Sequence, residues 1–407
     1  MDTGDTGWIL ASSALVLLMT PGLAFFYGGL VRRKSVVGVL MHSFTTMGIV
    51  GVVWVLWGYT LAFGPDVGSF IGNLDYLGLS KLSAVNGDIT GGTIPDFAFV
   101  IFQGMFAIIT PALITGAFAE RIKFSSYIIF TVLWVTIVYA PMAHWVWGGG
   151  WLGNWGVLDF AGGAVVHMNS GVAALAAALI IGRRMRHGME PFNAHNVPFV
   201  ILGAALLWFG WFGFNAGSAL TSGGAASLAF LVTNTAAAAG ALTWMGLSWR
   251  CTGKASAVGA ACGAVAGLVA ITPAAGYVGP MPSILIGIGA GAFCYMGVYM
   301  IRKWRVDDAL DVFAVHGIGG TWGALATGIF VAVGTAGAFD LGGIDRMEQI
   351  GKQLVAIGAT WGWSFVMTAV ILLAIKYTIG LRVDEATEEE GFDTAIHGDE
   401  AYPAASS

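Results

Sequence analysis

Two histidines, His167 and His316, lie inside long apolar, glycine-rich segments that read FAGGAVVHMNSG and DVFAVHGIGG. Ionisable side chains inside a membrane span are rare and costly, and they mark substrate or proton pathways. Each imidazole offers one donor and one acceptor, so a hydrogen bond shared between two of them fixes both tautomers. Because the unperturbed pKa of histidine is ~6.5, neither ring binds a proton so tightly that it would hold it. The two residues favour a pathway for a solute that exchanges protons; the alternative is two separate core histidines.

A cluster of tryptophans precedes the first histidine, in the run HWVWGGGWLGNW. A Trp at the mouth of a pore can hold a cation against its ring face, which contributes ~0.5–2 kcal/mol. Tryptophans at this depth are also the usual anchors at the membrane interface. Composition does not choose between these roles, nor among Trp145, Trp147, Trp151 and Trp155.

Two further apolar segments carry aromatic and polar residues. Phe102 and Phe106 are four residues apart and share a helix face, a spacing more typical of a packed core than of a gate. Phe214 and Ser218 occur together in GWFGFNAGS. A polar group in such a span either bonds a neighbouring helix or contacts the solute.

Two aspartates begin the segments that carry the histidines. Asp159 lies eight residues before His167, near enough to orient a site, although capping the helix is an equally common role. Asp311 opens the second segment and is the candidate cap there, or it orders the inner pore mouth.

The composition predicts the fold class of the protein that contains these residues. The 407 residues are 57% hydrophobic and 10% charged, with a mean hydropathy of +0.78, whereas about a quarter of the residues in a soluble domain are charged. The 61 glycines fit helices that pack closely in lipid. Alternating strands of ~10 residues, which a membrane barrel requires, are absent from the sequence. We therefore expect an all-α polytopic membrane protein.

Eleven stretches are long enough to cross ~30 Å of hydrocarbon. Their approximate limits are 8–31, 36–63, 96–119, 124–146, 160–182, 197–219, 226–249, 256–275, 281–301, 310–333 and 350–376. Fifteen of the 18 Lys and Arg residues, Arg183, Arg184 and Arg186 among them, follow odd-numbered stretches and so lie on one side. The positive-inside rule then predicts an outer N-terminus and a cytoplasmic C-terminus.

Eleven stretches divide naturally into five, five and one. The expected units are a transporter domain over 1–376, with pseudo-repeats at about 8–182 and 197–333 and a last helix at 350–376, and a cytoplasmic regulatory tail over 377–407. An odd number of spans per half makes the second half run opposite to the first, as in the inverted repeats of transporters. At ~1.5 Å per residue, each histidine is roughly 10 Å from its own face of the membrane, so both fall near the midplane.

Several runs resemble the ammonium transporter (Amt/Mep/Rh) family, and its Amt branch most closely. The resemblance covers all eleven stretches and most of the tail. It is carried by APMAHWVWGGG, LDFAGGAVVH, GWFGFNAGS, GLVAITPAAGYV, LDVFAVHGIGG and the tail motifs GLRV, GFD and HGDEAY.

This resemblance implies a role for each aromatic position. Trp147 and Ser218 are similar to an outer site that recruits ammonium, which Phe102 lines by a cation–π contact. Phe106 and Phe214 are similar to a stacked aromatic gate beneath that site.

The resemblance also covers the pore and the assembly. His167 and His316 match the paired histidines of a narrow pore, and Asp159 matches a residue that keeps the recruitment region in shape. The family forms trimers with one pore per subunit, and a PII signal protein commonly plugs the cytoplasmic face. The acidic run after Arg382 departs from the family pattern, so control by PII is the less secure expectation.

The expected function is ammonium transport across the cell membrane by a multi-pass protein that is not an enzyme and uses no metal, cofactor or nucleic acid. Ammonium would be deprotonated at the aromatic site, ammonia would cross the pore, and the proton would follow. Three alternatives stay open: a sensor acting through a separate partner, an electroneutral gas channel of the Rh type, and a redox protein with a bis-histidine haem.

Overall fold

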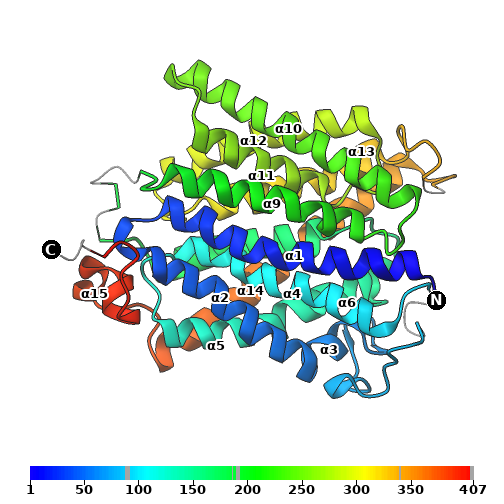
Figure 1. Cartoon of the computed structure of the whole chain (residues 1–407), viewed down its shortest axis with the longest axis horizontal. Helices are drawn as coiled ribbons and strands as arrows, with labels where there is room; N and C mark the ends of the chain where they lie inside the picture. The colour runs from blue at the N-terminus through cyan, green and yellow to red at the C-terminus, as the bar shows by residue number, and fades with distance from the viewer. Residues whose placement is uncertain (88–91, 186, 189–192, 339–340, 404–407) are drawn as a thin grey trace.

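The computed structural model describes residues 1–87, 92–185, 187–188, 193–338 and 341–403. Arg186 and the last four residues of the expected tail, 404–407, lie outside the described residues. Long helices run side by side along one axis, and the N-terminus and α15 lie at opposite ends of this axis (Figure 1). The protein is a helical membrane protein, as its composition predicts.

The first half contains the elements up to α8. A two-stranded antiparallel hairpin, with Asp66 opposite Gly72, lies between its second and third long helices. In chain order the elements are α1 Thr3–Leu30, η1 Arg33–Ser35, α2 Val36–Val53, η2 Trp54–Gly58, α3 Tyr59–Phe63, β1 Asp66–Val67, β2 Ile71–Gly72, η3 Leu77–Leu79, α4 Asp96–Phe118, α5 Phe124–Trp134, η4 Val135–Tyr139, α6 Ala140–Trp147, α7 Trp151–Asn154, η5 Gly163–Met168 and α8 Asn169–Ile181.

The second half and the tail contain the remaining elements. They are α9 Val197–Gly217, α10 Gly224–Thr252, α11 Ala257–Ile271, α12 Pro280–Lys303, η6 Phe313–Ile318, α13 Gly319–Phe330, α14 Arg346–Thr378, α15 Glu385–Glu390 and η7 Asp393–His397. In Figure 1 the helices of this half, green to yellow, lie on the opposite side of α1 from α2, α4 and α5.

Helical structure occurs within each of the eleven predicted stretches. In the described part of the chain, nine helices are long and apolar enough to cross a membrane. The stretch predicted at 256–275 contains a shorter helix, which ends at Ile271 and is followed by Pro273. A proline lacks the amide hydrogen that would continue the helix. The count of eleven crossings, the orientation and the division into domains stay predictions.

Glycines allow the two halves to approach closely where the site is built. A Cβ on Gly203 of α9 would lie 2.2 Å from the backbone nitrogen of Phe26 on α1, so these two helices pack backbone to backbone. A Cβ on Gly171 of α8 would lie 2.1 Å from the backbone nitrogen of Gly317 in η6. Any larger side chain at Gly171 would push apart the two helices that carry His167 and His316.

A buried ion network joins the loops at the α15 end of the bundle. Glu120 accepts from Arg32 at 3.0 Å and lies 3.4 Å from Arg184, while Asp307 pairs with Arg121 at 3.2 Å and with Arg184 at 2.7 Å. Burial alone would raise the pKa of Asp307, but the hydrogen bonds and charges of the two arginines hold it well below its usual range. Asp307 therefore stays ionised at neutral pH and anchors the loop that leads into η6.

Candidate functional site

An open cavity of about 580 Å³ lies where the start of α4 meets the ends of α6 and α9. Phe106, Trp147 and Ser218 line it, and Trp147 is the one tryptophan of its run among the lining residues. The Trp147 indole nitrogen donates to the backbone oxygen of Asp159 at 2.9 Å, and the Ser218 hydroxyl donates to the backbone oxygen of Phe214 at 2.8 Å. These bonds hold Trp147 and Ser218 in place.

Phe102 occupies a different place from the one that the resemblance implies. It is fully buried and is not among the residues that line this cavity. Its ring contacts that of Phe106 edge-on, with centroids 5.0 Å apart. A Cβ on Gly217 would lie 2.8 Å from the Phe102 ring, which shows how tightly α9 packs against it. Phe102 therefore affects the site by packing against Phe106 and holding that ring in position.

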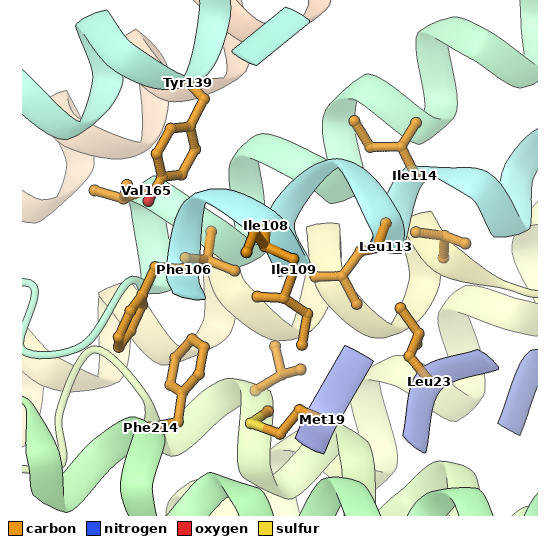
Figure 2. Close-up of a cluster of buried hydrophobic side chains, with 14 of the residues drawn as sticks. Met19, Leu23, Phe106, Ile108, Ile109, Leu113, Ile114, Tyr139, Val165 and Phe214 are labelled. Carbon is orange, nitrogen blue, oxygen red and sulfur yellow. The ribbon is translucent and has the colours of Figure 1, made fainter. Parts of the chain in front are cut away.

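Beneath the cavity, Phe106 of α4 and Phe214 of α9 lie against each other. Their centroids are 4.3 Å apart and both rings are buried. Figure 2 shows the two rings next to each other, tilted by 38°, and Ile109, Leu113 and Met19 in the same cluster of buried apolar side chains. A solute that leaves the cavity toward the interior must displace or pass these rings.

The two histidines lie directly below this aromatic pair. The Nδ1 atoms of His167 and His316 are 3.3 Å apart, a hydrogen bond in which one of them is the donor. The His167 ring stacks on Phe214 at 5.7 Å and on Trp211 at 5.2 Å, and its Nε2 has no partner among the described residues. Sequence analysis missed Trp211, because an aromatic residue that lines a pore looks the same in the sequence of an apolar helix as one that packs in the core.

Each histidine is carried by a π-helical turn that an aspartate caps. Asp159 Oδ1 accepts from the amides of Gly162 and Gly163 at 2.9 and 2.6 Å. Its Oδ2 accepts from Ala164 and Val165 at 2.8 and 3.3 Å, so both oxygens of the carboxylate are occupied. Four charge-assisted bonds from one side chain determine where η5 begins and therefore where the His167 ring points.

In the second half, the cap is Asp308 and not Asp311. The amide of Phe313 donates to Asp308 Oδ2 at 2.7 Å, whereas Asp311 lies 3.1 Å from Arg302 at the surface. The expectation that Asp311 caps this turn was wrong, because the backbone turns at Asp311, with a φ of 59°, and its side chain pairs with Arg302 instead. The sequence does contain the signal: Asp308 precedes His316 by eight residues, as Asp159 precedes His167.

Below the histidines, a closed cavity of about 20 Å³ continues along the molecule. That volume is enough for about one water-sized molecule. Its lining is almost entirely apolar, including Leu23, Ile109 and Val315, and the polar exceptions beside the histidines are Tyr27 and Cys262, which sequence analysis did not single out. Such a lining admits a small neutral solute and rejects an intact ion, because an ion would lose its hydration without replacement.

The described residues contain no group of three His, Cys, Asp or Glu side chains arranged to hold a metal ion. The two histidines contact each other through Nδ1, and the space beside them is far too small for a porphyrin ring. This geometry argues against the haem alternative.

Comparison with known proteins gives consistent matches. A family model described as the Ammonium Transporter Family matches residues 7–402. An ammonium transporter of Bacillus subtilis is 51% identical over 99% of both chains, and the ammonium transporter Amt1 of Archaeoglobus fulgidus is 45% identical over 99% of this chain and all of the other.

Solved structures match equally well along the chain. Saccharomyces cerevisiae Mep2 superposes with a TM-score of 0.88 at 39% identity, covering 95% of this chain and 88% of that one. A structure described as a sensor Amt protein superposes with a TM-score of 0.90 at 30% identity, covering 97% and 98%.

Proposed function

The chain belongs to the ammonium transporter family and is a multi-pass membrane transporter of ammonium, not an enzyme. We propose that it recruits ammonium against Trp147 and Ser218, removes one proton, and conducts ammonia past Phe106 and Phe214 into the pore bridged by the histidines. The removed proton crosses as well, so that transport carries charge.

One observation supports this proposal above all: the aromatic rings form a continuous column from the open cavity to the pore. The Trp147 ring lies 6.0 Å from that of Phe106, Phe106 lies 4.3 Å from Phe214, and Phe214 lies 5.7 Å from His167. His167 in turn lies 5.4 Å from His316. A cation is attracted to ring faces at the top of this column, and only a neutral molecule is accommodated at its bottom.

This arrangement separates ammonium from potassium by chemistry. The two ions have equal charge and similar size, so a ring of oxygen ligands would discriminate between them poorly. Moving any intact monovalent ion into an apolar bore costs on the order of tens of kcal/mol in a Born estimate, although relaxation reduces the cost. Ammonium avoids most of this cost by releasing a proton, and potassium has none to release.

The hydrogen bond between the histidines gives the proton its own route. A proton that reaches the free Nε2 of His167 converts that ring to an imidazolium, and the shared Nδ1 bond then passes a proton to His316. The net result is one ammonium equivalent moved with its charge. The experiment is current on a solid-supported membrane after an ammonium jump, compared with a potassium jump. Current with ammonium alone supports the proposal, and equal currents with both ions contradict it.

Replacing Trp147 by Leu is expected to weaken recruitment and leave the fold intact. Loss of a cation–π contact worth ~0.5–2 kcal/mol raises the half-saturating ammonium concentration by about 2- to 30-fold. Trp151→Leu is the matched control, because Trp151 is not among the residues lining the cavity. An unchanged half-saturation in Trp147→Leu would remove this residue from the site.

The same current separates the two alternatives from the same family. A sensor that acts through a separate partner would show little or no transport, and the neighbour described as a sensor shares the fold, so the fold does not exclude this role. An electroneutral gas channel would carry no current but would change the pH inside vesicles as ammonia enters. The ring faces that line the cavity favour recruitment of a cation and so argue against the gas channel.

The proposal extends to the assembly and to regulation: a homotrimer, as the family resemblance implies, and a PII protein at the cytoplasmic face. Support for regulation comes from the tail, which is packed onto the loops between transmembrane helices. Asp393 Oδ1 accepts from the amide of Gly38 at 3.0 Å, at the start of α2. Glu388 is buried, accepts from the amide of Met185 at 2.8 Å and pairs with Arg382. A tail with such contacts can transmit the binding of a partner to those loops.

Glu388→Ala is expected to release the tail without unfolding the protein. Losing a buried carboxylate that holds one amide and one guanidinium costs about 1–3 kcal/mol. The tail then detaches from the loops more often, and its backbone amides exchange hydrogen while it is detached. We expect the amides of 384–398 to exchange about 5- to 150-fold faster, as measured by mass spectrometry. Glu388→Gln, which keeps an acceptor for Met185, should show a smaller increase. Unchanged exchange in both variants would mean that Glu388 does not hold the tail.

A further inference from the structure

The loop between α12 and η6 contains a buried carboxylate that the function described so far does not use. Asp308 is 5% exposed. Its Oδ2 accepts from the Phe313 amide at 2.7 Å, but its Oδ1 has no hydrogen-bond partner among the described residues. A buried carboxylate oxygen without a partner is costly and calls for an explanation.

Comparison with the other half shows that capping alone does not explain Asp308. Asp159 and Asp308 each precede a histidine of the pair by eight residues and each caps a π-helical turn. The four amides around Asp159 occupy both of its oxygens. Asp308 accepts a hydrogen bond on Oδ2, and its Oδ1 has no hydrogen-bond partner among the described residues. The two halves therefore differ: both oxygens of Asp159 are hydrogen-bonded, whereas one oxygen of Asp308 is not.

The segment that follows Asp308 forms the wall of the inner pore. Leu310 and Val312 line the same closed cavity as His316. A Cβ on Gly116 of α4 would lie 2.5 Å from Val312 Cγ2, 3.0 Å from Tyr27 Cζ and 3.1 Å from Leu310 Cβ, so α1, α4 and this segment pack closely at this point. Tyr27, which lines the same cavity, is near enough to Asp308 for the two groups to interact electrostatically, so the carboxylate lies beside the inner pore.

We propose that Asp308 is the proton acceptor at the inner end of the pore, taking on Oδ1 the proton that the histidine pair delivers and passing it to ammonia at the exit. This inference rests on the proposed function, in which a proton follows ammonia across. An N–H bond of the His316 imidazolium breaks and, through water, an O–H bond forms on Asp308. That O–H bond then breaks as ammonia gains an N–H bond and becomes ammonium. Both imidazoles are then neutral again, with the direction of their shared hydrogen bond reversed, and the carboxylate is ionised; rotation of the two N–H assignments back to the starting tautomers completes the cycle.

The surrounding charges suit such a role. Burial raises the pKa of Asp308, the neighbouring Asp311 carboxylate raises it further, and backbone amides and Arg121 oppose these effects, leaving it at about 7. Above that pH the carboxylate is ionised and accepts a proton; below it, the group is already protonated and cannot. The charged and titratable groups around the loop include Tyr27 on α1, Arg121 beyond α4, Arg184 and His187 after α8, Cys262 on α11, Arg302 on α12, and Asp307 and Asp311 on the loop itself.

The test is ammonium-driven current in vesicles of defined internal pH, under a constant ammonium gradient. Asp308→Asn keeps an oxygen for the Phe313 amide but cannot titrate. We expect its current to be about tenfold lower at unchanged half-saturation. We also expect wild-type current to fall as internal pH decreases from about 8.5 to about 5.5, with a midpoint near the pKa, while the remaining Asp308→Asn current stays flat. Asp308→Glu, which restores a carboxyl group, should recover both the current and its pH dependence.

Two results separate the failure of this proposal from the failure of the proposed function. If the wild type carries ammonium current and Asp308→Asn matches it in size and pH dependence, only the role of Asp308 is overturned. If the wild type carries no ammonium current, both fail. Should Asp308→Asn not fold, the wild-type profile decides: a flat profile overturns the proposal. Asp311→Asn removes the like charge that raises the pKa of Asp308. A shift of the midpoint of the current to lower pH in this variant supports the proposal.

Discussion

His167→Ala is expected to abolish the ammonium-specific current, lowering it by at least ~100-fold, a loss of about 3 kcal/mol in the transition-state free energy. The substitution removes the only ring that contacts both the aromatic gate and His316 among the described residues. It also leaves the Nδ1 of His316 without its partner in an apolar pore. The proton then has no route across, whatever happens to ammonia.

The measurement is the current after an ammonium jump on a solid-supported membrane, with a potassium jump in parallel. His187→Ala is the matched control, because it makes the same substitution at a partly exposed histidine in the loop after α8, outside the pore. A His167→Ala protein that retains both the current and its preference for ammonium over potassium would contradict the proposed mechanism.

Asp159→Ala is expected to cause the largest loss of stability among the variants considered. Four buried amides at the start of η5 lose their acceptor at once. With about 1–3 kcal/mol for each buried donor left without a partner, and some relaxation, the loss is at least about 3 kcal/mol. The Trp147 indole also donates to the backbone of Asp159, so the open cavity that Trp147 lines is expected to change shape together with the pore.

Thermal unfolding in detergent and ammonium current together test this prediction. Asp159→Asn retains an amide oxygen as acceptor and should lose less stability than Asp159→Ala. Asp345→Ala removes a single exposed cap, that of α14, and should cost only about 0.5–2 kcal/mol. Similar melting temperatures for Asp159→Ala and Asp345→Ala would show that the four bonds around Asp159 do not organise η5.

The sequence was most informative about properties that are local or periodic. Each stretch that hydropathy predicted contains helical structure, because a membrane-spanning helix must satisfy its own backbone hydrogen bonds within a continuous apolar run. The depth of His167 and His316 followed from counting residues along helices of constant rise, and the structure places the two rings 5.4 Å apart. The family motifs were recognisable because they are short and continuous.

Side-chain direction was the least predictable property. Phe102 and Phe106 share a face of α4, yet only Phe106 of the two lines the open cavity, because α9 packs over Phe102. Asp311 was the candidate cap because it opens the apolar run, but the bond to the Phe313 amide comes from Asp308. Tyr27, Cys262 and Trp211 reach the pore from helices whose sequences show no sign of it.

The amino-acid sequence by itself predicted a helical membrane protein with two histidines at matching depth, and its short motifs carried the resemblance to ammonium transporters. Composition, charge alternation and helical rise are properties of the chain alone, so they can be read before any tertiary contact is known. Only the tertiary structure decided which rings form the column, which oxygen of Asp308 is left without a partner, and how the tail lies on the loops. These features arise where helices distant in sequence meet, and the contact of Gly171 with Gly317 exists only once both halves have packed together.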